Sequence, residues 1–219
     1  MDSRDLSNCQ SSYDLIAKEY ADRIYNELDG KPLDRKLLDA FAARLKDAGP
    51  VCEIGCGPGH VARYLHDRGV EIFGLDLSPG MLEQARRLNP GIEFRQGNMV
   101  SLDFQDGALA ALVAFYSILH IPRAELPDVF REFRRVLRPG GLLFLAFHIG
   151  LEVHHEDDLW GRKISLDFVF FTRQEVRRYL LTAGFAVEDS LEREPYPEIE
   201  VQTRRAYILA KKPAHKRKA

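Results

Sequence analysis

Short runs rich in apolar residues alternate along this chain with segments in which apolar residues recur every three or four positions. Each short run predicts a buried strand, and each helical spacing predicts an amphipathic helix. The predicted strands are 51–54, 70–75, 92–95, 110–115, 142–147, 186–191 and 204–210. The predicted helices are two within 10–47, separated by Gly30-Lys31-Pro32, one each in 58–68, 126–137 and 172–183, and one that begins at Ser78. Strands that alternate with helices predict an α/β fold, with the last two strands as an antiparallel pair.

The first predicted strand ends in a turn with three glycines at alternate positions, Gly55, Gly57 and Gly59. Such a turn brings backbone close to a ligand, because glycine has no Cβ in the way. The order differs from the Gly-x-Gly-x-x-Gly of dinucleotide sites, and no Gly-Lys-Ser/Thr phosphate loop is present. Glu53 would repel a pyrophosphate and attract an amino group. The turn therefore predicts a nucleotide-type ligand with a cationic end.

A second acid ends the next predicted strand. Asp76 follows Glu53 by 23 positions, close to the interval of about 20 residues at which a βαβ unit places a ribose-binding carboxylate. Ser78 and Pro79 come directly after it and predict a helix cap and a first helical turn. We expect Asp76 to accept hydrogen bonds from ribose hydroxyls.

Three segments resemble the class I S-adenosylmethionine-dependent methyltransferases. Residues 53–59 match their first motif, Asp/Glu-x-Gly-x-Gly-x-Gly. Residues 13–20 are similar to the Tyr-Asp-x-x-Ala-x-x-Tyr segment of small-molecule methyltransferases, and residues 135–147 to an Arg-x-Leu-Arg-Pro-Gly-Gly segment with its following strand. The resemblance implies S-adenosyl-L-methionine as the cofactor. It also implies a doubly wound, Rossmann-like sheet of seven mostly parallel strands in the order 3-2-1-4-5-7-6, with helices on both faces.

The resemblance further implies a set of cofactor-binding residues. These are Tyr20, Glu53, Gly55, Cys56, Gly57 and Gly59 by the methionine part, Asp76 at the ribose, Leu77 and Met81 by the adenosine, Asn98 and Met99 by the adenine, and Phe115 near the reaction centre. Asn98 stands where the family usually has Asp, so its hydrogen bond to the adenine amine would lack charge assistance. Asn98 is alternatively a turn residue that bonds its own backbone. Tyr13 and Tyr20 are alternatively packing residues with a polar tip.

The stretch after the 110–115 strand bears on the acceptor. The carboxyl end of a central strand is where open α/β sheets bind ligands, so Tyr116, Ser117 and His120 are expected near the reaction centre. The stretch lacks the Asn/Asp-Pro-Pro-Tyr/Phe of enzymes that methylate nucleic-acid bases, and is similar to the Leu-His-x-Ile segment of methyltransferases acting on free metabolites. Transfer would be an in-line displacement, with a base needed only for a protonated nucleophile. Candidate catalytic residues are Tyr116, His120 and His148, although His120 has a structural alternative.

Residues 148–172 form an insert too long for a simple connection, and we expect a lid or substrate wall. The insert contains histidines and carboxylates that invite a metal interpretation, but a solvated acidic loop is favoured because neighbouring residues in a loop lack a defined ligand geometry. A second set, Cys52, Cys56 and His60, coincides with the first strand and the glycine turn. We predict no required metal.

Composition limits the remaining possibilities. The 219 residues, 45% of them hydrophobic, predict one methyltransferase domain over 1–212, with a helical cap at 1–48, and a basic tail at 213–219. A net charge of −2 offers no field for nucleic acid. No apolar run of about 18 residues and no secretory signal occur. Three cysteines do not predict a disulfide framework.

From these features we expect a cytoplasmic monomer or homodimer that binds a small-molecule acceptor and neither nucleic acid nor membrane. Two alternatives stay open: a non-catalytic cofactor-binding or scaffold protein, and, less favoured by the glycine spacing, a nicotinamide-dependent oxidoreductase.

Overall fold

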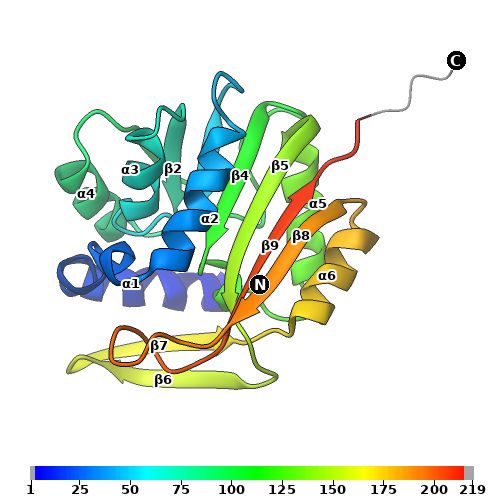
Figure 1. Cartoon of the computed structure of the whole chain (residues 1–219). Coiled ribbons are helices and arrows are strands. Elements are labelled where there is room, and N and C mark those ends of the chain that lie inside the picture. The colour runs from blue at the N-terminus through cyan, green and yellow to red at the C-terminus, as the bar shows by residue number, and fades with distance from the viewer. Residues whose placement is uncertain (1–2, 215–219) are drawn as a thin grey trace, which may run out of the picture.

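A seven-stranded sheet with helices on both faces organises the computed structural model, which describes residues 3–214 (Figure 1). The helices are α1 (Ser3–Ile24), η1 (Glu27–Gly30), α2 (Pro32–Ala43), α3 (His60–His66), α4 (Pro79–Leu88), η2 (Ile118–His120), α5 (Leu126–Val136) and α6 (Arg173–Thr182), of which η1 and η2 are 3-10 turns. The strands are β1 (Val51–Ile54), β2 (Ile72–Asp76), β3 (Phe94–Gln96), β4 (Leu109–Phe115), β5 (Leu137–His148), β6 (Val153–Leu159), β7 (Arg162–Val169), β8 (Ala186–Arg193) and β9 (Arg205–Lys211).

The order of strands in the main sheet is β3-β2-β1-β4-β5-β9-β8. Because β6 and β7 form a separate two-stranded sheet, the seven strands counted along the chain stand in the expected order 3-2-1-4-5-7-6. The strands β3, β2, β1, β4 and β5 run parallel, and β9 pairs antiparallel with both β5 and β8. The predicted fold class and the predicted antiparallel end of the sheet are confirmed.

Two predicted boundaries differ from the structure by five residues or more. The first helix begins at Ser3, not near residue 10. The fifth strand begins at Leu137, five residues before the predicted Leu142. The segment 138–141 stays in the sheet as a register shift, since Leu137 lies opposite Leu109 and Leu142 opposite Ala111. Backbone bonds of Gly140 and Gly141 with Lys212 hold that segment, so its glycines shape a bulge within the strand and not only the end of a helix.

The insert 148–172 forms a β-hairpin, so the expectation of a loop was wrong, whereas its acidic residues in β6 are exposed as expected. Its strands β6 and β7 are joined by a turn at Trp160 and Gly161, whose φ angles are +54° and +77°. Alternate residues of β7, Ile164 and Leu166, are buried and cluster with Ile16 of α1. That alternation of period two in 162–169 is the sequence signal that predicts a strand here.

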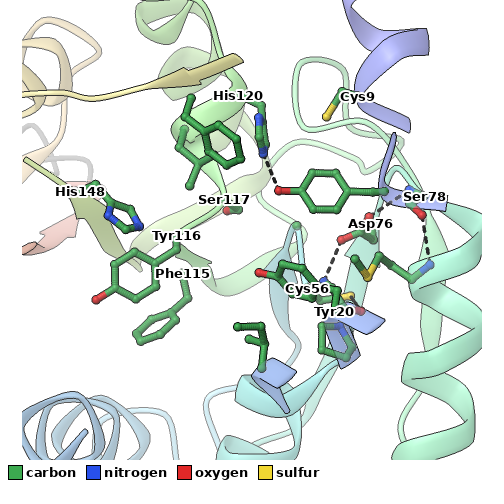
Figure 2. A pocket seen from close by; sticks show the side chains of 18 of the residues that line it. Cys9, Tyr20, Cys56, Asp76, Ser78, Phe115, Tyr116, Ser117, His120 and His148 are labelled. Carbon is green, nitrogen blue, oxygen red and sulfur yellow. Dashed lines mark hydrogen bonds between the residues drawn. The ribbon is translucent and has the colours of Figure 1, made fainter. Parts of the chain in front are cut away.

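Helices lie on both faces of the sheet, and α1 and the β6–β7 hairpin cover the edge at which its parallel strands end. Helices α2 and α3 pack on one face of the sheet, and α5 and α6 on the other. Figure 1 shows α1 crossing the ends of the strands, with the β6–β7 hairpin beyond it. Helix α1 packs against both α4 and β7. A cavity is thereby enclosed where parallel strands end, and its lining side chains are drawn in Figure 2.

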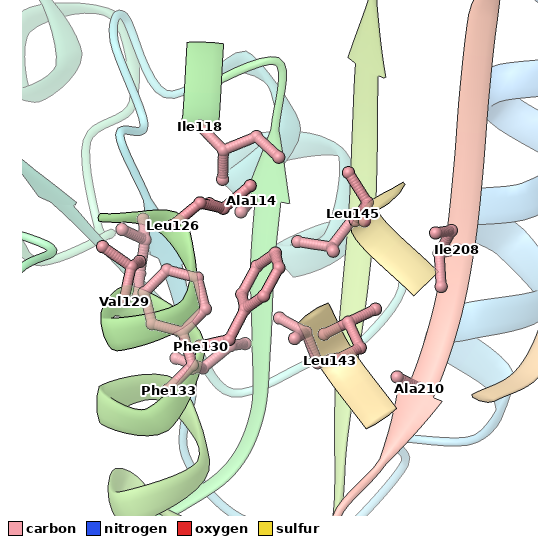
Figure 3. Close-up of a cluster of buried hydrophobic side chains, with 14 of the residues drawn as sticks. Ala114, Ile118, Leu126, Val129, Phe130, Phe133, Leu143, Leu145, Ile208 and Ala210 are labelled. Carbon is pink, nitrogen blue, oxygen red and sulfur yellow. The ribbon is translucent and has the colours of Figure 1, made fainter. Parts of the chain in front are cut away.

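The larger core cluster lies beneath α5 (Figure 3). Val129, Phe130 and Phe133 on one face of that helix are at most 1% exposed and pack against the strand residues Leu145 and Ile208. Burying one such side chain stabilises the fold by about 1.5–3 kcal/mol. This core holds the strands whose ends build the cavity. Within residues 3–214, no helix combines the length and apolar character needed to cross a bilayer.

Candidate active site

One cavity of about 840 Å³ gathers the residues predicted for the site. It lies at the carboxyl ends of β1, β2, β4 and β5 and is covered by α1, the hairpin and the 199–205 segment. The predicted residues that line it are Tyr20, Glu53, Gly55, Cys56, Gly57, Asp76, Leu77, Met81, Asn98, Met99, Phe115, Tyr116, His120 and His148. Gly59 does not line it. The volume is in the upper part of the range for small-molecule sites, about 300–1,000 Å³.

The three glycines of the turn differ in the space available for a Cβ. All have positive φ, +65° at Gly55, +50° at Gly57 and +78° at Gly59. A Cβ on Gly55 would lie 2.4 Å from the Ser117 Cβ, and one on Gly59 would lie 2.7 Å from the Phe94 ring. At Gly57 the nearest atom to an added Cβ is in the Tyr20 ring, at 3.8 Å. Gly57 therefore opens onto the cavity, while Gly59 serves packing.

Asp76 joins the turn to the next helix. Its Oδ2 accepts from the Gly57 amide at 2.8 Å and its Oδ1 accepts from the Ser78 amide at 2.9 Å. Ser78 Oγ accepts from the Met81 amide, so the predicted helix cap is confirmed. Burial raises the pKa of the Asp76 carboxyl. Donors from a ligand that approach this carboxylate would compensate that burial.

Glu53 is 1% exposed, and its Oε2 accepts from the amide of Ala62 at 2.7 Å. Burial raises the pKa of this carboxyl well above its ordinary value. A buried carboxyl with a raised pKa favours an adjacent cation, because the cation stabilises the ionised form. Glu53 therefore fits the amino group of a bound amino acid.

The far end of the cavity is lined by apolar and amide side chains. Leu77, Met81 and Met99 contribute apolar surface there. Asn98 lines the cavity too, but its Oδ1 accepts from the Val100 amide at 3.0 Å. The alternative interpretation, a turn residue that bonds its own backbone, is thus present in the structure, and it occupies one acceptor position of that oxygen.

The three candidate catalytic residues lie around the middle of the cavity (Figure 2). Tyr116 has a positive φ of +54°, and its hydroxyl lies 3.0 Å from the Tyr207 hydroxyl and 3.3 Å from Asp34 Oδ1. Burial raises its pKa well above the ordinary tyrosine value. The hydroxyl thus belongs to a buried network, and the Tyr116 ring supplies cavity wall.

His120 uses both ring nitrogens. Nδ1 lies 2.9 Å from the carbonyl oxygen of Asp167, which can only accept, so Nδ1 carries the proton. Nε2 then accepts from the Tyr13 hydroxyl at 2.7 Å. Burial lowers the pKa of His120 to about 4. The structural alternative for His120 matches these bonds, which join η2 to α1 and to the hairpin.

His148 ends β5 with its ring parallel to Phe170 at a centroid distance of 5.5 Å and an interplanar angle of 14°. Its Nδ1 lies 2.6 Å from Thr203 Oγ1. Burial, then the nearby Arg205 and Lys31 charges, lower its pKa to about 3. His148 is neutral near pH 7 and lies beside Tyr116, with 5.1 Å between ring centroids.

The sequence analysis did not name two groups of cavity residues individually. The hairpin, expected as a lid or substrate wall, contributes His154, Glu156 and Leu159 of β6, Phe168 of β7, and Trp160 and Phe170 directly after these strands. A buried charged group contributes Glu27, Lys31, His60, Glu200 and Arg205. The two-residue period of a strand could have predicted the first group. The second group is formed by residues far apart in sequence, so no local sequence pattern predicts it.

The charged group forms a closed network at one side of the cavity. Lys31 is 3% exposed, and its Nζ lies 2.6 Å from Glu27 and 3.3 Å from Glu200. Glu27 also pairs with His60 Nε2 at 2.9 Å. Burial alone would raise the pKa of Glu27, but the hydrogen bonds to His60 and Lys31 lower it to about 2. His60 Nδ1 is buried and without a hydrogen-bond partner among the described residues.

The cavity residues fit an amino-acid nucleoside. Gly57 leaves room that a Cβ would fill, Asp76 and Glu53 are acceptors, and the buried Ser117 Oγ and His60 Nδ1 have no partner within residues 3–214. For a metal, the described part of the chain contains no group of three or more His, Cys, Asp or Glu side chains placed to hold one. The absence of a required metal stays a prediction.

Comparison with known proteins finds methyltransferases similar to part of this chain. Residues 51–141 match the family model described as a methyltransferase domain. The chain is 37% identical over 114 residues to the malonyl-[acyl-carrier protein] O-methyltransferase of Enterobacter lignolyticus, covering 51% of this chain and 44% of that protein. It is 32% identical over 145 residues to a probable S-adenosylmethionine-dependent methyltransferase of Mycolicibacterium smegmatis, covering 64% of this chain and 53% of that protein. The chain thus spans about half the length of these curated relatives.

A solved structure supports the fold. The crystal structure of an S-adenosylmethionine-dependent methyltransferase from Methanosarcina mazei has a TM-score of 0.68 to this protein, with 20% identity, and covers 76% of this chain and 93% of that one. Residues 51–141 of this chain therefore match a methyltransferase domain, and the chain has the fold of a solved S-adenosylmethionine-dependent methyltransferase.

Proposed function

We propose that the protein transfers the methyl group of S-adenosylmethionine to a small-molecule acceptor bound between the glycine turn and the hairpin. The proposal rests on one cavity that extends from the glycine turn to the hairpin. Gly57 and Asp76 line its first part, and the aromatic side chains Tyr116, Phe168 and Phe170 line its second part. A mostly apolar cavity with a few placed polar groups is typical of small-molecule sites.

We assign cofactor binding to the residues around the turn. Asp76 would hold the ribose, and Glu53 the amino group, where a cation favours its ionised form. Leu77, Met81 and Met99 would surround the adenosine, with Asn98 beside the adenine. Gly55 and Gly57 would let backbone approach the methionine part, with Cys56 contributing backbone because its side chain is buried. Tyr20 and Phe115 would close the site over it.

The chain's own contribution to the chemistry is positioning. The sulfonium cofactor supplies an electrophilic methyl group when it is bound. The protein then has to align a nucleophile with it and to exclude water, which α1 and the hairpin do by covering the cavity. Tyr116 and His148 would form the wall that orients the acceptor. His120 would hold the cover in place through Tyr13 and Asp167.

Ligand-dependent stabilisation tests the proposal. A ligand that binds only the folded state stabilises it by RT ln(1 + [L]/Kd), which is about 2.7 kcal/mol at 100 times Kd. We expect S-adenosylhomocysteine to raise the melting temperature and NAD to leave it unchanged. The reverse result would contradict the proposal and favour the oxidoreductase alternative.

Transfer itself needs a second measurement. Incubation of the protein with methyl-labelled S-adenosylmethionine and a fractionated metabolite extract should place label in a low-molecular-weight product. Binding of S-adenosylhomocysteine with no labelled product from any fraction would favour the non-catalytic alternative. We also propose a cytoplasmic monomer or homodimer that does not bind nucleic acid, to be checked by light scattering and by retention on immobilised DNA.

A further inference from the structure

A chain of three polar side chains runs from the sheet into the cavity beside the expected reaction centre. Arg205 is 2% exposed, and its Nη1 donates to Thr203 Oγ1. Thr203 Oγ1 lies 2.6 Å from His148 Nδ1. All three residues line the cavity, and they come from β9, the segment before it and the end of β5.

The direction of these bonds fixes the tautomer of His148. A guanidinium has only donors, so the Thr203 oxygen accepts from Arg205 and has one proton left to give. If that proton goes to His148 Nδ1, the Thr203 hydroxyl both accepts and donates a hydrogen bond, and Nε2 carries the ring proton. If Nδ1 donated instead, the Thr203 proton would find no acceptor among the described residues. His148 therefore presents an N–H donor at Nε2, for which the described chain contains no acceptor.

A donor at this position changes the role of His148. A neutral imidazole with a protonated Nε2 cannot take a proton there, and its depressed pKa keeps it neutral at pH 7. His120 Nε2 already accepts from Tyr13, and the Tyr116 hydroxyl lies in the network with Asp34 and Tyr207. None of the three candidate bases has a free lone pair directed at an acceptor. With these three side chains engaged in this way, a nucleophile that arrives without a proton to lose fits the site best.

The surroundings of His148 favour an anion at its Nε2. The Lys31 ammonium and the Arg205 guanidinium lie 5.3 Å and 5.6 Å from the centroid of the Tyr116 ring, which is 5.1 Å from the His148 ring. Glu27 and Glu200 balance these cations but are bound to them directly. Phe170 stacks on the His148 ring and supplies an apolar surface beside it. A low-dielectric wall strengthens a hydrogen bond from a neutral donor to a charged oxygen.

We propose that the acceptor is a carboxylic acid whose ionised oxygen is bound by His148 Nε2–H and is itself methylated, which gives a methyl ester. This inference rests on the proposed function and deepens it. In the reaction, one carboxylate oxygen forms a bond to the methyl carbon while the carbon–sulfur bond breaks and its electron pair goes to sulfur. A sulfonium cation and a carboxylate anion become a neutral thioether and a neutral ester. No proton is released, so no base is required.

The chemistry of the product gives the first test. Methyl esters release methanol in cold alkali, whereas methyl groups on nitrogen, carbon or ether oxygen do not. The protein is incubated with methyl-labelled S-adenosylmethionine and a pool of small carboxylic acids, and the product is treated with hydroxide. Label recovered as volatile methanol is the expected result. Label that survives the treatment, or that enters only a parallel pool of amines and alcohols, would overturn the inference.

Binding to the product complex gives the second test, which needs no turnover. Calorimetry on the protein saturated with S-adenosylhomocysteine compares three probes of similar shape: phenylacetate, phenylacetamide and phenethylamine. Phenylacetate should bind about tenfold more tightly than the other two, as expected for a charge-assisted hydrogen bond. Equal affinities, or a preference for the amine, would overturn the inference and leave the proposed function intact. Failure of S-adenosylhomocysteine itself to bind would contradict the proposed function.

Variants assign the effect to the polar chain. His148→Phe should weaken phenylacetate binding about tenfold, and His148→Gln, which retains an N–H donor, by less than about threefold. Thr203→Val keeps the shape but removes the hydroxyl, and should weaken binding about fivefold without changing affinity for S-adenosylhomocysteine. His155→Phe is the matched control on the outer face of the hairpin, where His155 pairs with Asp167. Equal probe affinities in all four variants would remove His148 from the acceptor site.

Discussion

The amide of Gly57 donates to Oδ2 of Asp76 over 2.8 Å, so the turn after β1 and the acid that ends β2 are joined by a direct hydrogen bond. Asp76 Oδ1 is bound in turn by the amide of Ser78 at the start of α4. One carboxylate thus sets the distance between two loops that both line the cavity. Its loss should affect the shape of the turn as well as any bond to a ligand.

Replacing Asp76 should therefore cost more cofactor affinity than one lost ligand contact. Hydrogen bonds to a charged group contribute about 1.5–3 kcal/mol, so Asp76→Ala should weaken S-adenosylhomocysteine binding at least about tenfold. Asp76→Asn keeps one acceptor oxygen and should be intermediate. Calorimetry measures both, with Asp103→Ala, an exposed carboxylate, as the control. Unchanged affinity in Asp76→Ala with an intact circular dichroism spectrum would remove Asp76 from the site.

Gly57→Ala should weaken ligand binding, whereas a matched glycine substitution away from the cavity should lower only the stability. Gly57→Ala places a Cβ toward the cavity at a φ of +50°, and Gly69→Ala places one in open space at a φ of +81°. Both substitutions strain the backbone by about 1 kcal/mol, but only the first adds bulk where the ligand backbone contact is expected. Melting temperatures of the two variants should fall alike, while affinity for S-adenosylhomocysteine falls only in Gly57→Ala. Parallel affinities would contradict the assignment of Gly57.

The tip of the hairpin is held to α1 by Trp160. Its ring centroid lies 6.1 Å from that of Tyr20, and the Arg23 guanidinium carbon lies 4.9 Å from the Trp160 centroid. Cation–π contacts at exposed sites contribute about 0.5–1 kcal/mol, so Trp160→Ala should speed amide hydrogen exchange in 153–169 about two- to fivefold. Leu151→Ala, an exposed apolar residue near the base of the hairpin, is the control. Identical exchange in the two variants would show that Trp160 does not hold the hairpin closed.

Two buried histidines should make stability depend on pH. Burial lowers the pKa of His120 to about 4 and that of His148 to about 3, below the value of about 6.5 expected in the unfolded chain. Between about pH 6.5 and 4 the unfolded state binds more protons, so each histidine reduces the free energy of unfolding as the pH falls, by about 2 kcal/mol at pH 5.

Glu53 has a raised pKa, so its contribution to the free energy of unfolding changes with pH in the opposite direction. Comparing a His120 variant with the unmodified protein isolates the contribution of the histidine, because Glu53 is present in both proteins. His120→Gln should flatten the acid side of the stability curve relative to the unmodified protein, measured by urea unfolding at pH 7, 6 and 5. Equal slopes in the two proteins would show that His120 titrates alike in the folded and unfolded chains.

Local patterns predicted the part of the cavity around the glycine turn and Asp76, whereas contacts between distant residues form the part around Tyr116 and His148. Gly55, Gly57 and Asp76 follow from spacing within one βαβ unit, since strand ends meet at one edge of a parallel sheet. The partner of the Tyr116 hydroxyl, Tyr207, is 91 positions away, and Thr203 is 55 positions from His148. No local periodicity encodes such pairings. Tyr116 and His148 were therefore placed correctly in the cavity, while the hydrogen bonds that govern their chemistry came from the structure.

The β6–β7 hairpin forms a sheet of its own, and it meets the rest of the chain through a bridge between Ile149 and Phe171 at its base and through the packing of β7 against α1. A segment so attached can change its inward side chains without altering the strand order of the main sheet. Exchange of residues 153–169 for a hairpin of different inward residues should thus give a chimera that keeps its nucleotide and changes its acceptor. Under the proposed function, the main sheet would be the constant part of the protein that binds the cofactor, and the hairpin would be the exchangeable part that selects the acceptor.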